Sequence, residues 1–201
     1  YERLNHLKSS LPVTSIHTIA IKTNPHAQML KTLVDLGFGL EAASIEEVHL
    51  ALNAGCPAER VVFDSPVKTK HEINEVARLN GMLVNVNSIE ELTRFPNDPA
   101  CYIGIRINPQ VRTGGPEMYD VSRNESKFGV PIEHQEAIIQ AALTFPVCAL
   151  HMHSGSQMKN LTVQRQALEC LKSLADEINA RMPGKINTVS YTHLTLPTSP
   201  K

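Results

Sequence analysis

The sequence lacks the features that mark several specialised classes of protein. Its 201 residues include no tryptophan and four cysteines, and aromatic residues make up 4% of the total. The cysteines are far apart and form no Cys-x-x-Cys pair, which excludes a disulfide scaffold and favours reduced thiols in a cytoplasmic protein. Neither sign of charge dominates, because 19 Lys and Arg face 20 Asp and Glu. This balance argues against nucleic acid or an anionic membrane as a partner.

Long hydrophobic runs are also missing. No window of the sequence approaches the roughly 18 to 20 apolar residues that a membrane-spanning helix requires. The first residues do not form the apolar segment of a secretory signal peptide. We therefore expect a cytoplasmic chain, long enough for one domain with a substantial buried core.

Short runs of β-branched and other apolar residues alternate with stretches in which apolar residues recur at helical spacing. We expect seven strands, at residues 16–21, 38–42, 60–63, 83–86, 101–107, 147–152 and 186–189. Three capping boxes follow strands and should open helices: Ser44 to Glu47, Thr69 to Glu72, and Ser88 to Glu91. Glycines 37, 55 and 81 stand where those helices should end.

This alternation predicts an α/β fold with a parallel sheet covered by helices. The first four strands begin about 22 residues apart, and such equal units favour a (β/α)8 TIM-type barrel over a doubly wound sheet. A closed barrel needs eight strands, so we expect an incomplete one. Two segments break the rhythm: a polar stretch at 110–124, and residues 190–201, which have neither strand nor helix period.

Reactive side chains stand at the ends of three expected strands, where a (β/α) barrel carries its chemistry. Lys22 ends the first strand among apolar residues, which would desolvate its amine and favour attack on an aldehyde; the alternative is a lysine that extends into solvent. Glu41 is a carboxylate in an otherwise apolar run and should need a partner. Arg106 offers a permanent charge to an oxyanion, or else an ion pair to a neighbouring strand.

Two histidines end the sixth expected strand. His151 and His153 share a face, and could be metal ligands, an acid–base or stacking histidine with a structural neighbour, or two core histidines. No Asp or further His follows a later strand to complete a metal site. The Ser-Gly-Ser that includes Ser156 offers hydroxyl and N–H groups suited to a phosphate. Together with Lys22, this set suggests an aldehyde-bearing, phosphorylated cofactor.

At this point the sequence resembles a known family, the pyridoxal-phosphate-dependent decarboxylases of ornithine, arginine and diaminopimelate, which share the alanine-racemase-like barrel. Five segments carry the resemblance, in the family's order: Ala20–Pro25, Glu41–Ser44, Arg106–Pro109, Ser126–Val130 and His151–Gln157. Residues 108–129 are most similar to diaminopimelate decarboxylases, whereas residues 63–68 look more like ornithine decarboxylases. Diaminopimelate decarboxylase is the closer match.

The resemblance implies a role for each matching residue. Lys22 would be the Schiff-base lysine that holds pyridoxal 5'-phosphate, and His153 would stack on the pyridine ring. Ser156 would hydrogen-bond the phosphate, Arg106 would lie near the phenolic oxygen, and Glu41 would lie near Lys22 and His153. The implied reaction is decarboxylation of a basic or diamino acid by a protein that is a homodimer when full length.

The sequence also departs from the family pattern. After residue 189 the family's Asp-x-Gly-Gly-Gly is absent, and 190–201 resembles a translated sequencing adapter. We therefore expect residues 1–189 to be a partial cofactor-binding barrel and 190–201 to be non-native. The C-terminal β-domain is missing as well, so we expect the chain itself to be inactive. The alternatives are a non-catalytic cofactor-binding or regulatory homologue, an amino-acid racemase on the same barrel, and a metal-dependent hydrolase.

Overall fold

One parallel sheet organises the chain. The computed structural model describes residues 6, 9, 12–111, 122, 124–153 and 161–192. Neighbouring strands follow the order β1-β2-β3-β4-β5-β7-β8, and a two-residue strand, β6 (Val130–Pro131), pairs with β5 outside this order. The main strands are β1 (Thr18–Ala20), β2 (Gly39–Ala42), β3 (Val61–Phe63), β4 (Leu83–Val86), β5 (Tyr102–Asn108), β7 (Val147–His153) and β8 (Thr188–Thr192). Every pairing is parallel.

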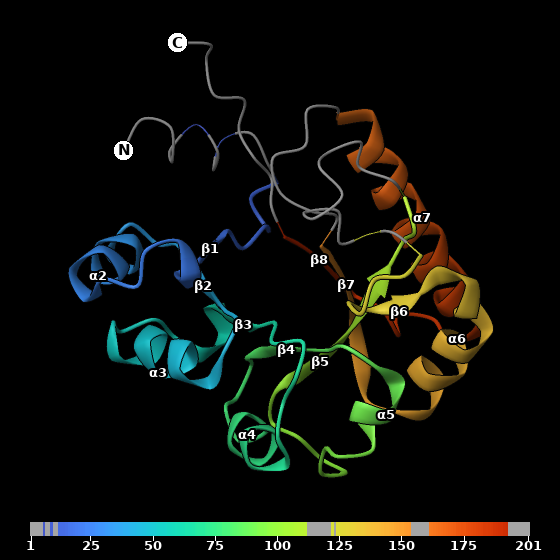
Figure 1. The fold of residues 1–201 in the computed structure, drawn as a ribbon, viewed down its shortest axis with the longest axis horizontal. Coiled ribbons are helices and arrows are strands. Elements are labelled where there is room, and N and C mark those ends of the chain that lie inside the picture. Colours follow the sequence, from blue (N-terminus) through green and yellow to red (C-terminus); the bar gives the residue numbers. More distant parts are fainter. Residues whose placement is uncertain are drawn as a thin grey trace.

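Helices cover the outer face of this sheet. They are α2 (Ala27–Asp35), α3 (Ile45–Asn53), α4 (Lys70–Val76), α5 (Ile89–Leu92), α6 (Gln135–Thr144) and α7 (Leu161–Arg181). Figure 1 shows the sheet curving with these helices on its convex side and with β1 and β8 at the two ends of the arc. The α/β class and the incomplete barrel expected from the sequence are therefore confirmed.

The expected strands and the observed strands differ most at the two ends of the sheet. β1 ends at Ala20, and residues Ile21–Thr23 form one turn of 3-10 helix instead of continuing the strand. β8 begins at Thr188 and continues to Thr192, so its last three residues come from a segment expected to have no strand. Pairing with β7 extends the strand there, a long-range effect that local periodicity does not contain. The polar stretch expected at 110–124 lies mostly outside the described residues.

The three expected capping boxes behave differently. Thr69 and Glu72 form the complete box at the start of α4. The Ser44 hydroxyl accepts a hydrogen bond at the start of α3. The Ser88 side chain makes no cap bond. The Glu91 carboxylate bonds a buried lysine and the backbone N–H of Asn87. The glycines expected to end helices, at 37, 55 and 81, have positive φ.

The hydrophobic core lies between the sheet and the helices. Leu40, Phe63, Val84 and Ile105 come from four strands and are fully buried in it. Because strand side chains alternate between faces, the residues between them lie on the concave inner face. Within the described ranges, no helix is both long and apolar enough to cross a lipid bilayer.

Candidate functional site

The concave face of the sheet is polar at the carboxyl ends of the strands. Glu41 from β2, Asn85 from β4, Arg106 from β5 and His151 from β7 are all buried there, and Asp64 follows β3 directly. The register of the sheet pairs Arg106 with His151 on adjacent strands. Parallel strands bring their carboxyl ends to one edge, which is where (β/α) barrels hold their active sites.

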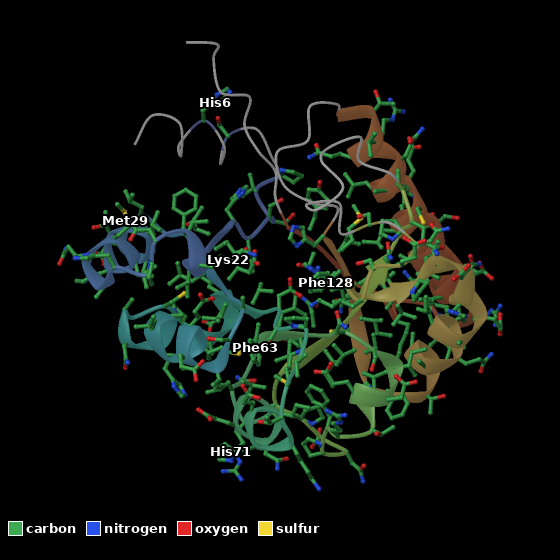
Figure 2. The ribbon with its side chains drawn as sticks, in the orientation of Figure 1. His6, Lys22, Met29, Phe63, His71 and Phe128 are labelled. Carbon is green, nitrogen blue, oxygen red and sulfur yellow. The ribbon has the colours of Figure 1, made fainter. Side chains whose placement is uncertain are left out.

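Lys22 lies at this edge but not in the expected environment. The sequence predicts a lysine at the end of a strand, desolvated by apolar neighbours, and the predicted desolvation is wrong. Lys22 belongs to the 3-10 turn Ile21–Thr23, and its side chain is exposed. The strand ends two residues earlier, so the turn carries the lysine out of the sheet pleat. Figure 2 shows its side chain directed towards the space that the curved sheet encloses.

Glu41 is a buried carboxyl group whose pKa is affected by the charge of Lys22. Its residue is 6% exposed. Burial raises the pKa of Glu41, and the negative charge of Asp64 raises it further, whereas the positive charges of Lys22, His151 and Arg106 lower it. The net shift is upward, which favours the protonated carboxyl. The three positive groups act on Glu41 but do not offset its burial.

Asp64 and His151 form a buried contact that local sequence patterns do not predict. His151 Nε2 lies 3.0 Å from Asp64 Oδ2, and neither side chain is more than 5% exposed. Burial by itself raises the pKa of Asp64, but the charge and hydrogen bond of His151 and the charges of Arg106 and Lys68 together lower it to about 2. Of the readings left open for His151, these contacts and its full burial favour a structural core histidine. Asp64 could have been found from its position, directly after a strand, as Lys22 was.

The structure brings together Arg106 and His153, two of the predicted site residues. The Arg106 Nη2 atom lies 3.4 Å from His153 Nδ1, and the guanidinium carbon lies 4.9 Å from the centre of the Phe128 ring. Burial lowers the pKa of Arg106, and the charges of Asp64 and Glu41 oppose that shift. In the structure Arg106 therefore contacts an imidazole and an aromatic ring at the mouth of the sheet.

A second buried cluster lies beside the first. The Lys68 ammonium contacts Glu91 Oε1 at 2.9 Å and the carbonyl oxygens of Ser65 and Asn85 at 2.7 and 2.6 Å. Burial lowers the pKa of Lys68, although Glu91 and Asp64 oppose this shift. All three ammonium protons of Lys68 thus have acceptors, and these bonds connect the segment after β3 with β4 and α5. It is a structural lysine, in contrast to exposed Lys22.

The sequence also raised two questions about ligands, namely which residue binds the phosphate and whether the site holds a metal ion. Ser156, expected to bind the phosphate, lies outside the described residues. Among the residues that are described, no group of three or more His, Cys, Asp or Glu side chains could hold a metal ion.

The donor set fits the ring end of pyridoxal phosphate. The concave face presents an exposed amine at Lys22, a guanidinium at Arg106, an imidazole at His153 and a carboxyl group with a raised pKa at Glu41. An amine can react with an aldehyde, a guanidinium can bind an anionic oxygen, and a flat imidazole can stack on a ring. These are the groups that an anionic aromatic aldehyde requires.

Comparison with known proteins gives a consistent result. Diaminopimelate decarboxylase from Aquifex aeolicus is 29% identical over 189 residues, which span 90% of this chain and 44% of the relative. Its counterpart from Helicobacter pylori strain 26695 is 31% identical over 88% of this chain and 46% of the relative. The chain thus spans less than half the length of these two relatives.

Solved structures show the same fold. A Helicobacter pylori diaminopimelate decarboxylase complexed with L-lysine superposes with a TM-score of 0.83 at 25% identity, covering 94% of this chain and 50% of that one. An arginine decarboxylase of Paramecium bursaria Chlorella virus, bound to agmatine, has a TM-score of 0.74 at 16% identity, which shows a shared fold; it covers 94% of this chain and 60% of that one.

A family model decides the assignment. The model described as "Pyridoxal-dependent decarboxylase, pyridoxal binding domain" matches residues 1–189, and the cofactor of that family is pyridoxal phosphate, as the sequence predicted. The chain belongs to the pyridoxal-dependent decarboxylases, and the part that it represents is their pyridoxal binding domain.

Proposed function

We propose that the protein containing this chain decarboxylates a basic or diamino acid with pyridoxal phosphate, and that its substrate resembles diaminopimelate. The observation that best supports the proposal lies on the concave face of a sheet that belongs to this family: the charges of Lys22 and Arg106 act on the Glu41 carboxyl, and Arg106 contacts His153. Eight relatives that are 28–31% identical to this chain are all named diaminopimelate decarboxylases. One solved relative holds L-lysine, the compound left when diaminopimelate loses one carboxylate.

Each residue has a distinct task in this proposal. Lys22 would hold the cofactor through its exposed amine and, once released by the substrate, could accept or return a proton. Arg106 would bind an anionic oxygen of the cofactor, and His153 would orient the ring by stacking. Glu41 would lie beside Lys22, with a pKa above its ordinary value because it is buried. When bound, pyridoxal phosphate supplies the electron sink for the charge left on the α-carbon as CO2 departs.

The choice of lysine is the first point to test. The chain would be mixed with pyridoxal phosphate, reduced with borohydride, digested and mapped by mass spectrometry. We expect the pyridoxyl group on Lys22, and its complete loss in Lys22→Ala, because that amine is exposed on the inner face while Lys68 is fully enclosed. Lys31→Ala, which alters an exposed lysine on α2, is the matched control and should keep the label. Labelling centred on any other lysine contradicts the assignment.

Decarboxylation itself belongs to the longer protein. We propose that the chain alone releases no CO2 from diaminopimelate, because it spans less than half of the relatives that it matches. We also propose that the full-length protein is a cytoplasmic homodimer, that residues 1–189 are its partial barrel, and that 190–201 are foreign to it. CO2 release by the full-length protein separates the decarboxylase from a regulatory homologue or a racemase, neither of which removes a carboxylate.

A further inference from the structure

A side-chain amide outside the proposed catalytic set binds a turn at two points. Asn87 directly follows β4, and its Nδ2 atom donates to the carbonyl oxygen of Lys127 at 3.1 Å. Its Oδ1 atom accepts a hydrogen bond from the N–H of Gly129 at 2.9 Å. Both ends of one amide therefore hold the backbone on either side of Phe128.

The turn also packs closely against the backbone of β5. Gly129 has φ +77° and lies so near the strand that a Cβ atom there would meet Arg106 O and Asn108 N at 3.0 Å. This conformation and this contact both require glycine. The turn therefore lies against the very residues that carry the Arg106 side chain.

Asn87 is itself anchored. Its backbone N–H donates to Glu91 Oε2 at 3.0 Å, and the other oxygen of that carboxylate bonds buried Lys68. These bonds fix the backbone of Asn87, so its side-chain amide can hold the turn in one position.

Between the two clamped residues, Phe128 covers Arg106. The ring centre lies 4.9 Å from the guanidinium carbon, and Arg106 is 5% exposed. On another side the guanidinium meets His153. A cation over an aromatic face in a desolvated place gains stability and a preferred orientation. Loss of the ring would give the guanidinium room to rotate and admit water.

We propose that Asn87 is a positioning residue: by clamping the Lys127–Gly129 turn it places Phe128 over Arg106 and so orients the guanidinium for an anionic oxygen of pyridoxal phosphate. The part that concerns the ligand rests on the proposed function. The clamp itself rests only on contacts within this chain.

The clamp can be tested without cofactor, by the rate at which an arginine reagent, phenylglyoxal, modifies Arg106 in the chain, followed by peptide mapping. Arg165, whose side chain is 80% exposed although it pairs with Glu169, gives the rate for an exposed arginine. We expect Arg106 to be protected in the original chain and to react about three- to tenfold faster in Asn87→Ala and in Phe128→Leu, as the loss of a partly buried cation–π contact implies. Phe128→Tyr keeps the ring and should keep the protection.

Two controls separate a local change from unfolding. Asn74→Ala removes an exposed amide from α4 and should leave Arg106 protected. Cys101 is 5% exposed, so it should stay unreactive towards a thiol reagent in any variant that remains folded. Only variants that meet this criterion are compared. Arg106 that stays as protected in a folded Asn87→Ala as in the original chain overturns the clamp. If Asn87→Ala unfolds by this criterion, the comparison of Phe128→Leu with Phe128→Tyr decides whether the ring protects Arg106, and equal protection in these two variants overturns the proposal.

The role towards the cofactor has its own readout. Titration with pyridoxal phosphate should give a Kd about three- to tenfold higher in Phe128→Leu than in the original chain, and an unchanged Kd in Asn74→Ala. Faster modification of Arg106 with an unchanged Kd would refute the ligand part of the proposal. If the original chain binds no pyridoxal phosphate, the proposed function fails, and the phenylglyoxal result still decides the clamp.

Discussion

Two buried acids on the concave face respond to nearly the same surroundings in opposite directions. Asp64 touches His151, and this contact, with the charges of Arg106 and Lys68, outweighs burial and lowers its pKa to about 2. Among the described residues no such contact offsets the burial of Glu41, so burial and the charge of Asp64 raise its pKa. A direct contact with His151 therefore separates the two acids, lowering one pKa while the other rises.

The first prediction at this scale concerns Asp64→Asn. Because the folded-state pKa of Asp64 is depressed to about 2 from its ordinary 3.8, its charge contributes stability above pH 4 that is lost as the pH falls towards 2. The shift corresponds to about 2 kcal/mol. We expect the variant to lose about that much unfolding free energy at pH 7, and the difference to shrink between pH 4 and pH 2. Urea denaturation at several pH values measures it; a difference that stays constant with pH would contradict it.

Among the secondary-structure elements, the packing of β4 against β5 depends on side-chain size at one pair of residues. β4 and β5 place Asn85 opposite Gly104, and a Cβ atom on Gly104 would lie 2.2 Å from Asn85 Oδ1. Within the described residues, the buried amide of Asn85 has no hydrogen-bond partner for its side-chain atoms. Glycine thus makes room for an amide whose polar groups are already costly to bury.

A double-mutant cycle follows from this contact. We expect Gly104→Ala to destabilise the chain by about 1–3 kcal/mol through overpacking. In an Asn85→Ala background the same substitution should cost much less, because the obstructing oxygen is gone. Asn85→Ala alone should cost little, since no described hydrogen bond is lost. Urea midpoints of the four proteins give the coupling energy. Strict additivity would show that the two residues do not compete for space.

The whole molecule has two open sheet edges within its described part. β1 pairs with β2 and β8 pairs with β7, and neither has a partner on its other side. Apolar residues near these edges are exposed, with Ile16 at 59% and Val189 at 49%. Unpaired strand edges with exposed apolar neighbours are templates for association with another chain.

We therefore expect this chain to self-associate as its concentration rises. Val189→Lys, which adds a charge on β8, should shift the equilibrium towards monomer in sedimentation velocity experiments. Leu168→Lys, at an exposed position of α7, adds the same charge away from both edges and serves as the control. A chain that stays monomeric throughout, or equal effects of the two lysines, would show that the edges do not drive association.

Local patterns are enough to predict the alternation of strands and helices, their parallel arrangement and the family. The Thr69 cap is one such pattern, and four of the five family motifs, all except Ser126–Val130, stand at the carboxyl ends of strands. Long-range packing was needed to show that Lys22 is exposed, that the Glu91 carboxylate bonds Lys68, and that Asp64 contacts His151. These contacts join residues far apart in the chain, because sheet register and curvature, which no local pattern encodes, bring them within bonding distance.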